Sequence, residues 1–219
     1  MAIVILNLKT YQECFQAGSL DLLSAVQSVS SEHQLVLCPS ALNAALVASH
    51  RKGGTPLLFA QHADANGFGA HTGSVSLQAL RELGFEGTLL NHSEKKIPHE
   101  AVEKTVAAAR ELGMKTVVCA DSIDEAKKVA AFSPWAVAIE PPELIGSGVS
   151  ISTAQPDVVV RGVEAIKSVD AKVKAFVGAG VSTRDDFQKS LRMGAEGVLL
   201  ASAFSKSKKP KEWLEAFLA

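Results

Sequence analysis

The sequence predicts an α/β fold: a single-domain (β/α)8 barrel in which eight parallel strands alternate with covering helices across residues 1–219. A barrel of this kind commonly fills a chain of 219 residues as one domain. Hydrophobic residues make up 47% of the chain and aromatic residues only 5%, so we expect a core of Val, Leu, Ile and Ala. Eight short apolar runs also recur at an average spacing of about 28 residues, the length of one strand-plus-helix unit.

The expected strands are near-continuous runs of aliphatic and β-branched residues, which is the pattern of strands buried on both faces. In chain order they are Ile3–Leu8, Leu35–Cys38, Leu57–Gln61, Thr88–Asn91, Thr116–Ala120, Ala136–Glu140, Val173–Val177 and Val198–Ala201. No change of composition and no low-complexity linker divides the chain. An open doubly wound sheet is the alternative, although such a sheet usually has fewer strands in this length.

The expected helices fill most of the gaps between these runs. They cover Leu20–Val29, Ala41–His50, Ser76–Leu83, Glu100–Leu112, Ile123–Phe132, Asp157–Ser168, Arg184–Met193 and a last helix from Pro210 to Leu218. The capping residues that we expect are Ser40, the pair Asp121-Ser122 and Thr183 at N-termini, Pro156 and Pro210 at helix starts, and Gly84 and Gly113 at C-termini.

Charge, cysteine content and the absence of long apolar runs indicate which partners and which compartment to expect. The net charge is −1, from 22 basic and 23 acidic residues, so no broad cationic face for nucleic acid is expected. Three cysteines, without CxxC spacing, do not form a disulfide framework; Cys38 and Cys119 lie inside apolar runs and should be small buried residues. No signal-peptide pattern and no run of membrane-spanning length occurs, so we expect a soluble, cytoplasmic protein.

The most informative segment is AIEPPELIGSG, residues 138–148, in which an apolar run ends at Glu140. Two prolines and a tip of small residues, Gly146-Ser147-Gly148, follow the carboxylate. Barrels hold their chemistry at the C-terminal ends of strands, so Glu140 is a candidate general base beneath a closing loop. The alternative is a solvent-exposed glutamate that begins an ordinary strand-to-helix loop.

Polar residues also end the first and fourth apolar runs. Asn7 and Lys9 are two residues apart, so an extended strand would direct both to the same face, where Lys9 could present a positive charge to an anionic substrate. A surface lysine is the alternative. His92 follows the fourth run, and Ser93 is expected to cap a helical turn whose dipole favours a neutral imidazole. Structural roles are the alternatives for Asn7 and His92. Glu94 is expected to support the site residues or the fold rather than to take part in the chemistry.

Three short segments are candidates for phosphate binding. They are Gly146-Ser147-Gly148, Gly178-Ala179-Gly180 after the seventh run, and Ala201-Ser202 after the eighth. Loops after strands seven and eight of a barrel recurrently bind phosphate through backbone N–H groups. A metal site is not expected, because His62, Asp64 and His71 have no further organised ligands. GxGxxG, Walker A and GxSxG motifs are absent.

Taken together, the motifs resemble the triosephosphate isomerase family, and the EPPELIG form resembles its archaeal branch. The segments that carry the resemblance run in order along the chain: NLKTY (7–11), QHADANGFGAHTG (61–73), NHSEKK (91–96), IEPPELIGSG (139–148), VGAG (177–180) and LLAS (199–202). The resemblance implies a TIM barrel that interconverts dihydroxyacetone phosphate and D-glyceraldehyde 3-phosphate through an enediolate, a step of glycolysis and gluconeogenesis. It implies neither a metal nor an organic cofactor.

The resemblance also implies a role for each matching residue. Glu140 would be the base, His92 the neutral electrophile, and Lys9 the positive charge, with Asn7 as a neighbouring polar donor. The phosphate pocket would be lined by Ile145, Gly146, Gly180, Ala201 and Ser202.

Two further features concern the efficiency and assembly of such an enzyme. Ala203 departs from the glycine-richer turn of many relatives, and its Cβ could tighten or misplace the phosphate turn. Asp64–Thr72 resembles the loop that reaches into a neighbouring subunit, which implies a homo-oligomer, either a dimer or a tetramer.

Other barrel proteins explain less of the sequence. An indole-glycerol-phosphate or phosphoribosyl isomerase type of enzyme would account for the fold and the phosphate segments, but not for Lys9, His92 and Glu140 together. A Schiff-base aldolase would need a lysine where the sixth run ends in Glu140. A non-catalytic scaffold barrel would not require the three residues at all.

Overall fold

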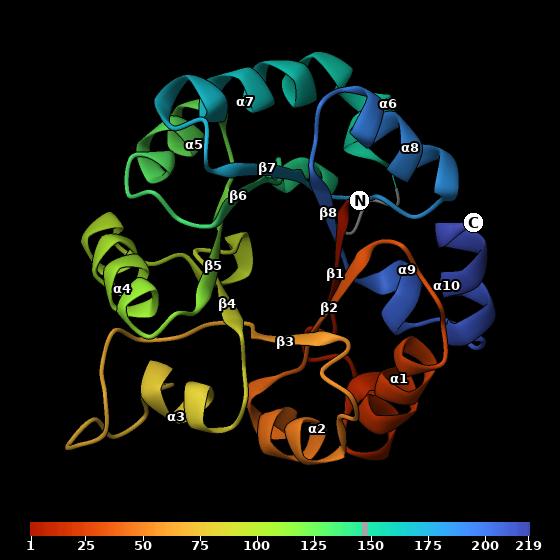
Figure 1. The fold of residues 1–219 in the computed structure, drawn as a ribbon. Helices are drawn as coiled ribbons and strands as arrows, with labels where there is room; N and C mark the ends of the chain where they lie inside the picture. The colour runs from red at the N-terminus through yellow and green to blue at the C-terminus, as the bar shows by residue number, and fades with distance from the viewer. Residues whose placement is uncertain (146–148) are drawn as a thin grey trace.

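The computed structural model describes residues 1–145 and 149–219, and in it eight parallel strands close into a barrel in the order β1 to β8 (Figure 1). The strands are β1 Ile3–Asn7, β2 Gln34–Cys38, β3 Leu57–Ala60, β4 Gly87–Leu90, β5 Lys115–Ala120, β6 Ala136–Ile139, β7 Lys174–Val177 and β8 Gly197–Leu200. Each begins and ends within one residue of its predicted run. Because β1 pairs with β8 from Ile3↔Gly197 to Leu6↔Leu200, the barrel prediction is confirmed and the open-sheet alternative is wrong.

Helices surround the strands on the outside of the barrel (Figure 1). The longer ones are α1 Ala17–Gln27, α2 Ala44–His50, α3 Leu77–Glu82, α4 His99–Glu111, α5 Ile123–Ala130, α7 Pro156–Val169, α8 Arg184–Arg192 and α10 Pro210–Leu218. The helical turn predicted after the fourth run is present as η3 Ser93–Lys95. Short helices that the sequence did not predict are η1 Gln12–Cys14, η4 Pro142–Leu144, α6 Ile151–Ala154 and α9 Ser202–Ser205. Across the described ranges, no helix combines the length and the apolar character needed to cross a bilayer.

Most of the predicted caps form. The Ser122 hydroxyl accepts a hydrogen bond from the backbone of Glu125, and Thr183 forms a capping box with Asp186. Gly84 and Gly113 have positive φ values of 85° and 67° directly after their helices.

The predicted cap at Ser40 is wrong in its detail. The predicted helix Ala41–His50 divides into η2, Ala41–Asn43, and α2, and the first turn is closed by the Asn43 N–H donating to the Ser40 carbonyl oxygen at 2.9 Å. Among the described residues the Ser40 side chain makes no capping hydrogen bond. Instead it lines a surface hollow beside β1.

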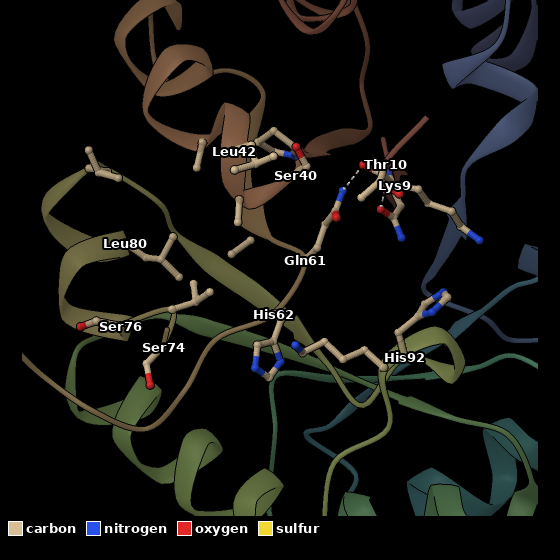
Figure 2. Close-up of a pocket in the computed structure, with 18 of the residues that line it drawn as sticks. Lys9, Thr10, Ser40, Leu42, Gln61, His62, Ser74, Ser76, Leu80 and His92 are labelled. Carbon is tan, nitrogen blue, oxygen red and sulfur yellow. Dashed lines mark hydrogen bonds between the residues drawn. The ribbon is translucent and has the colours of Figure 1, made fainter. Parts of the chain in front are cut away.

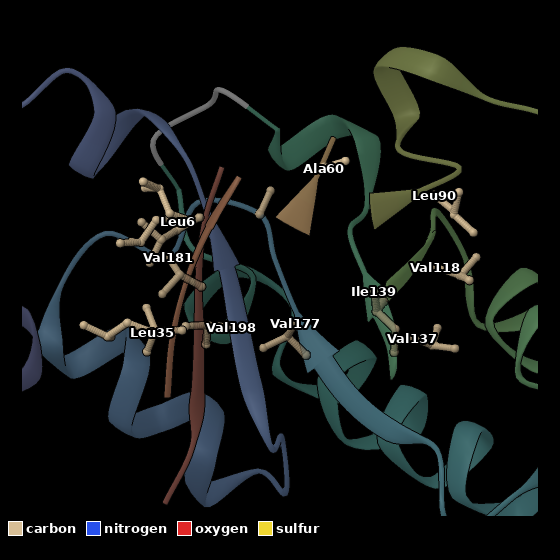
Figure 3. Close-up of a cluster of buried hydrophobic side chains, with 14 of the residues drawn as sticks. Leu6, Leu35, Ala60, Leu90, Val118, Val137, Ile139, Val177, Val181 and Val198 are labelled. Atoms are coloured by element: carbon tan, nitrogen blue, oxygen red, sulfur yellow. The ribbon is translucent and has the colours of Figure 1, made fainter. Parts of the chain in front are cut away.

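The core has two parts, separated by the barrel wall. Side chains from alternate strand positions fill the inside of the barrel: Ile3, Ile5, Val36, Cys38, Phe59, Leu89, Val117, Cys119, Ala136, Ala138, Phe176 and Leu199. Their sequence neighbours, such as Leu6, Val118 and Val198, pack outward against the helices (Figure 3). The predicted burial of Cys38 and Cys119 is confirmed.

Two strand glycines make room for the few aromatic rings inside the barrel. A Cβ at Gly87 would lie 2.6 Å from the Phe59 ring, and one at Gly197 would lie 2.8 Å from the Phe176 ring. Both rings also contact Trp135 edge-on near the N-terminal end of β6. The barrel is therefore a filled core, and chemistry is left to its ends.

Candidate active site

The carboxyl ends of the strands surround a narrow cavity. Every described residue that the sequence predicted for the site lines it: Asn7, Lys9, His92, Glu140, Ile145, Gly180, Ala201 and Ser202. Gly146, which was also predicted, lies outside the described residues. The lining residues come from the ends of β1, β4, β6, β7 and β8, so barrel closure is what brings them together.

The Glu140 carboxylate is buried directly after β6. Its residue is 5% exposed, so the alternative of a solvent-exposed glutamate is wrong. Burial raises the pKa of Glu140, and hydrogen bonding with the Cys119 thiol offsets part of that rise. Within the described part of the chain, Oε2 has no hydrogen-bond partner, and it lies 3.7 Å from His92 Nε2. A carboxylate with a raised pKa and a free acceptor oxygen is suited to general-base chemistry.

His92 itself caps the turn that follows β4. Its Nδ1 accepts a hydrogen bond from the backbone N–H of Glu94 at 3.1 Å, so the predicted cap at Ser93 is wrong. An imidazole nitrogen that accepts a hydrogen bond carries no proton, so this bond favours a ring whose proton is on Nε2, the nitrogen facing Glu140. The neutral imidazole stays a prediction, and the contact that favours it is this hydrogen bond rather than a helix dipole.

Lys9 is held inside the cavity by its neighbours. The side chain is 13% exposed and pairs with Glu94 Oε1 at 2.5 Å, so the surface-lysine alternative is wrong. The argument from an extended strand is also wrong, because β1 ends at Asn7 and Lys9 has a positive φ of 47°. The turn is fixed by Asn7 Oδ1, which accepts from the Lys9 N–H at 3.0 Å, and by Gln61 Nε2, which donates to the Lys9 and Cys38 carbonyl oxygens at 3.0 Å each.

Small residues let the ends of β7 and β8 approach the cavity closely. Gly180 has a positive φ of 73°, and a Cβ there would overlap the Val149 carbonyl oxygen. At Gly178, a Cβ would lie 2.7 Å from Glu140 Oε1. Ala203 lies in the short helix α9, a conformation that its Cβ does not hinder. The structure therefore shows no distortion of this turn at Ala203.

Comparison with known protein sequences identifies the family of the chain. The sequence model of the triosephosphate isomerase family matches residues 2–217. The chain belongs to the triosephosphate isomerase family. A triosephosphate isomerase from Archaeoglobus fulgidus is 40% identical over 98% of this chain and 96% of its own. One from Methanobrevibacter smithii is 41% identical over 97% and 95%. The resemblance to the archaeal branch is therefore confirmed, and the other barrel families are excluded.

Beside the narrow cavity, this member of the triosephosphate isomerase family has a wider hollow of about 660 Å³ (Figure 2). Lys9 and His92 lie on the border that the two share, and the wall of the hollow includes Leu42 and Leu80. The hollow is the larger space, but the narrow cavity contains the Glu140 carboxylate. We therefore assign the chemistry to the narrow cavity and consider the hollow separately.

The segment between β3 and α3 projects from the barrel, at the lower left of Figure 1. It contains the predicted subunit-crossing loop, Asp64–Thr72, and its Phe68 is 64% exposed. At its base, His62 Nε2 and Asp64 Oδ1 lie 3.2 Å apart. Among the described residues there is no group of three or more His, Cys, Asp or Glu side chains that could hold a metal ion.

The roles of several residues that support the site were not predicted from the sequence. Gln61 was predicted only as the end of a strand and as part of a family motif, yet its side chain fixes the turn at Lys9. Cys119 was expected to be a core residue, but its thiol also contacts the Glu140 carboxylate. Tyr11 lines the cavity, and the ammonium of Lys206 lies 4.3 Å from the centre of its ring. These contacts join residues far apart in the chain, so local sequence patterns do not reveal them.

Proposed function

We propose that the narrow cavity is where this member of the triosephosphate isomerase family interconverts dihydroxyacetone phosphate and D-glyceraldehyde 3-phosphate. The observation that carries the proposal is the pairing of Glu140 with His92, whose Oε2 and Nε2 atoms are 3.7 Å apart, with Lys9 lining the same cavity. A carboxylate base and a neutral imidazole donor on one small cavity match the two needs of an enediolate reaction. Triosephosphate isomerases are themselves the usual example of this acid–base pairing.

Glu140 is the base that moves the proton between the two substrate carbons. Its ionised carboxylate removes a proton from C1 of dihydroxyacetone phosphate, and the resulting carboxylic acid returns the proton to C2 of the enediolate. The pKa raised by burial supports this role, because it makes the carboxylate a stronger base while leaving it able to return the proton.

His92 and Lys9 stabilise the charge that develops on the substrate oxygens. The Nε2–H of His92 donates to the carbonyl oxygen and transfers protons between the two oxygens of the enediolate. The Lys9 ammonium adds a positive charge, and the Asn7 side chain is a neighbouring polar donor. Fixed groups of this kind stabilise an oxyanion strongly because they need no rearrangement during the reaction.

The phosphate group binds where the ends of β7 and β8 meet the loop after β6. The residues that we assign to it are Ile145, Gly146, Gly180, Ala201 and Ser202. The described members of this set line the same cavity as Glu140 and offer backbone groups and small side chains, which supports close approach of an anion. Exclusion of water from the bound enediolate would suppress the elimination of phosphate.

A coupled assay of glyceraldehyde 3-phosphate isomerisation tests this assignment. We expect turnover without added metal, unchanged by a chelator, and a loss of about 10²–10⁴-fold in kcat for Glu140→Asp, because the shorter side chain withdraws the base from C1. Circular dichroism checks that the variant is folded. Absence of turnover in the folded wild-type protein, or wild-type turnover in the variant, would contradict the proposal.

We further propose that the protein is a homo-oligomer, a dimer or a tetramer, that works in the cytoplasm. Two features support assembly: the projecting Asp64–Thr72 segment with its exposed Phe68, and the hollow beside Lys9, where Leu42 is 85% exposed. Large exposed apolar residues next to a concave surface are typical of protein interfaces. For the compartment, the three cysteines are free thiols, as is usual in a reducing environment.

A further inference from the structure

The Glu125 carboxylate, on α5, is the centre of a hydrogen-bond network behind the active site. Its side chain is 11% exposed and does not line the cavity. Oε1 accepts from Asn91 Nδ2 at 2.9 Å, Oε2 accepts from the backbone N–H of Asp121 at 3.0 Å, and Lys96 Nζ donates to both oxygens at 2.8 Å. One carboxylate thus joins the segment after β4 to the corner between β5 and α5.

Asn91 is the residue through which this network reaches His92. It is buried, directly precedes His92, and has a positive φ of 57°, a left-handed conformation that most side chains avoid. Besides its bond to Glu125, its Nδ2 donates to the Cys119 carbonyl oxygen at 3.0 Å, and its Oδ1 accepts from the Ile97 N–H at 3.2 Å. The side chain is therefore fixed at both ends while its backbone turns the chain into His92.

The electrostatics of the network keep Glu125 ionised. Burial alone would raise the pKa of Glu125, but hydrogen bonds from Asp121, Lys96 and Asn91 outweigh it and hold the pKa well below its usual range. The neighbouring carboxyl of Asp121 has a raised pKa, chiefly because of its hydrogen bond with Glu125. Hydrogen bonds to an ionised carboxylate are stronger than neutral ones, so Glu125 is an effective anchor for the Asn91 amide.

We propose that Glu125 is a positioning residue for His92. It holds Asn91 in the left-handed conformation, and Asn91 in turn sets where the imidazole Nε2 lies relative to the Glu140 carboxylate. Cys119 extends the argument, because its carbonyl oxygen accepts from Asn91 and its thiol contacts Glu140. The inference rests on the proposed electrophilic role of His92, and it adds a residue that touches neither the cavity nor the substrate.

The test compares Glu125→Gln with a matched control, Glu196→Gln. Glu196 is also a carboxylate that pairs with two lysines and accepts a backbone N–H, that of Ala175, but it lies at the opposite end of the barrel. For Glu125→Gln we expect kcat to fall about 10–100-fold with KM changed less than about twofold, since small displacements of a reacting group cost rate more than binding. For the control we expect both constants to stay within about twofold of wild type, the usual outcome of a surface substitution.

A double-mutant cycle with Asn91→Gly tests the route of the effect. Glycine keeps access to the left-handed conformation but loses all three side-chain hydrogen bonds, so the single variant should also lower kcat. If Glu125 acts through Asn91, then Glu125→Gln should cost less than about twofold in the Asn91→Gly background. The nitrogen NMR shifts of the His92 ring should move in both single variants and stay unchanged in the Glu196→Gln control.

Several results would overturn the inference. They are wild-type kcat in folded Glu125→Gln, an equal change of kcat and KM, full additivity with Asn91→Gly, or unchanged His92 shifts. Thermal unfolding of each variant separates a loss of stability from a loss of rate at the assay temperature. His92→Gln is the parallel experiment for the proposed function: wild-type turnover in that variant would refute the role of His92 itself, whatever Glu125 does.

Discussion

The Glu140 carboxylate lies where its charged form is poorly solvated, and this has a consequence for stability as well as for rate. Burial raises its pKa in the folded protein, whereas the unfolded chain keeps the usual value of about 4.3. Between those two pKa values the folded state binds more protons than the unfolded state. The free energy of unfolding that Glu140 contributes therefore falls as the pH rises through that window. The buried, ionised carboxylate of Glu140 therefore lowers the free energy of unfolding at neutral pH.

Replacing Glu140 with glutamine removes the charge at nearly constant size. We expect Glu140→Gln to raise the melting temperature at pH 7 relative to wild type, and this difference to disappear near pH 4, where the wild-type carboxyl is protonated too. At pH 7 the kcat should fall by about 10²–10⁴-fold. Thermal unfolding at both pH values, with the coupled assay, measures these effects. A melting temperature at pH 7 below that of wild type would contradict the account.

At the scale of elements, the strands and the ends of helices differ in how well the sequence predicts them. Each strand is a local aliphatic run that can be recognised without knowledge of its tertiary contacts. The bounds of all eight strands were therefore predicted to within one residue. The turn after β4 depends on a hydrogen bond from the Glu94 N–H to the His92 imidazole. Residue propensities for helix and turn do not predict such a bond. The division of the predicted helix Ala41–His50 likewise follows from a single backbone bond, that of Asn43 to Ser40.

The turn after β7 offers a test of the phosphate pocket with an internal control. Gly180 and Gly113 both have positive φ values, 73° and 67°, but a Cβ at Gly180 would overlap Val149 whereas one at Gly113 meets no atom within 4 Å. Alanine at either position should cost about 1–2 kcal/mol of stability from the left-handed backbone. Only Gly180→Ala should also raise KM for the triose phosphate, by roughly tenfold, if displacing the turn costs about 1.4 kcal/mol of binding.

Steady-state kinetics and denaturant unfolding of both variants measure this contrast. Gly113→Ala should lose stability with unchanged kinetic constants, because Gly113 follows α4 on the outside of the barrel. If Gly180→Ala left KM at the wild-type value in a folded protein, the assignment of Gly180 to the phosphate pocket would fail.

At the scale of the whole molecule, closure of the barrel is what creates the site. Neighbouring strands are about 28 residues apart in sequence, and only their closed order brings Lys9, His92 and Glu140 around one cavity. Their presence at strand ends was predictable, because the fold and the strand ends were. The contacts that orient them, such as Gln61 with Lys9 and Glu125 with Asn91, join distant segments and depend on the packed structure. Contacts of this kind cannot be predicted from the local patterns of a single sequence.

Assembly is the property that extends beyond one chain, and the hollow beside the active site provides its test. Light scattering of the wild-type protein should give the mass of a dimer or a tetramer. Leu42→Glu places a charge on an 85% exposed residue that lines the hollow. It should shift the protein towards monomers, because an unpaired charge buried in an interface is costly. Because Lys9 and His92 border the hollow, we expect the monomer to lose kcat by about tenfold or more through poorer positioning. Val160→Glu, on α7 and outside the hollow, is the control that should keep both mass and rate. A wild-type protein that scatters as a fully active monomer would refute the proposed assembly.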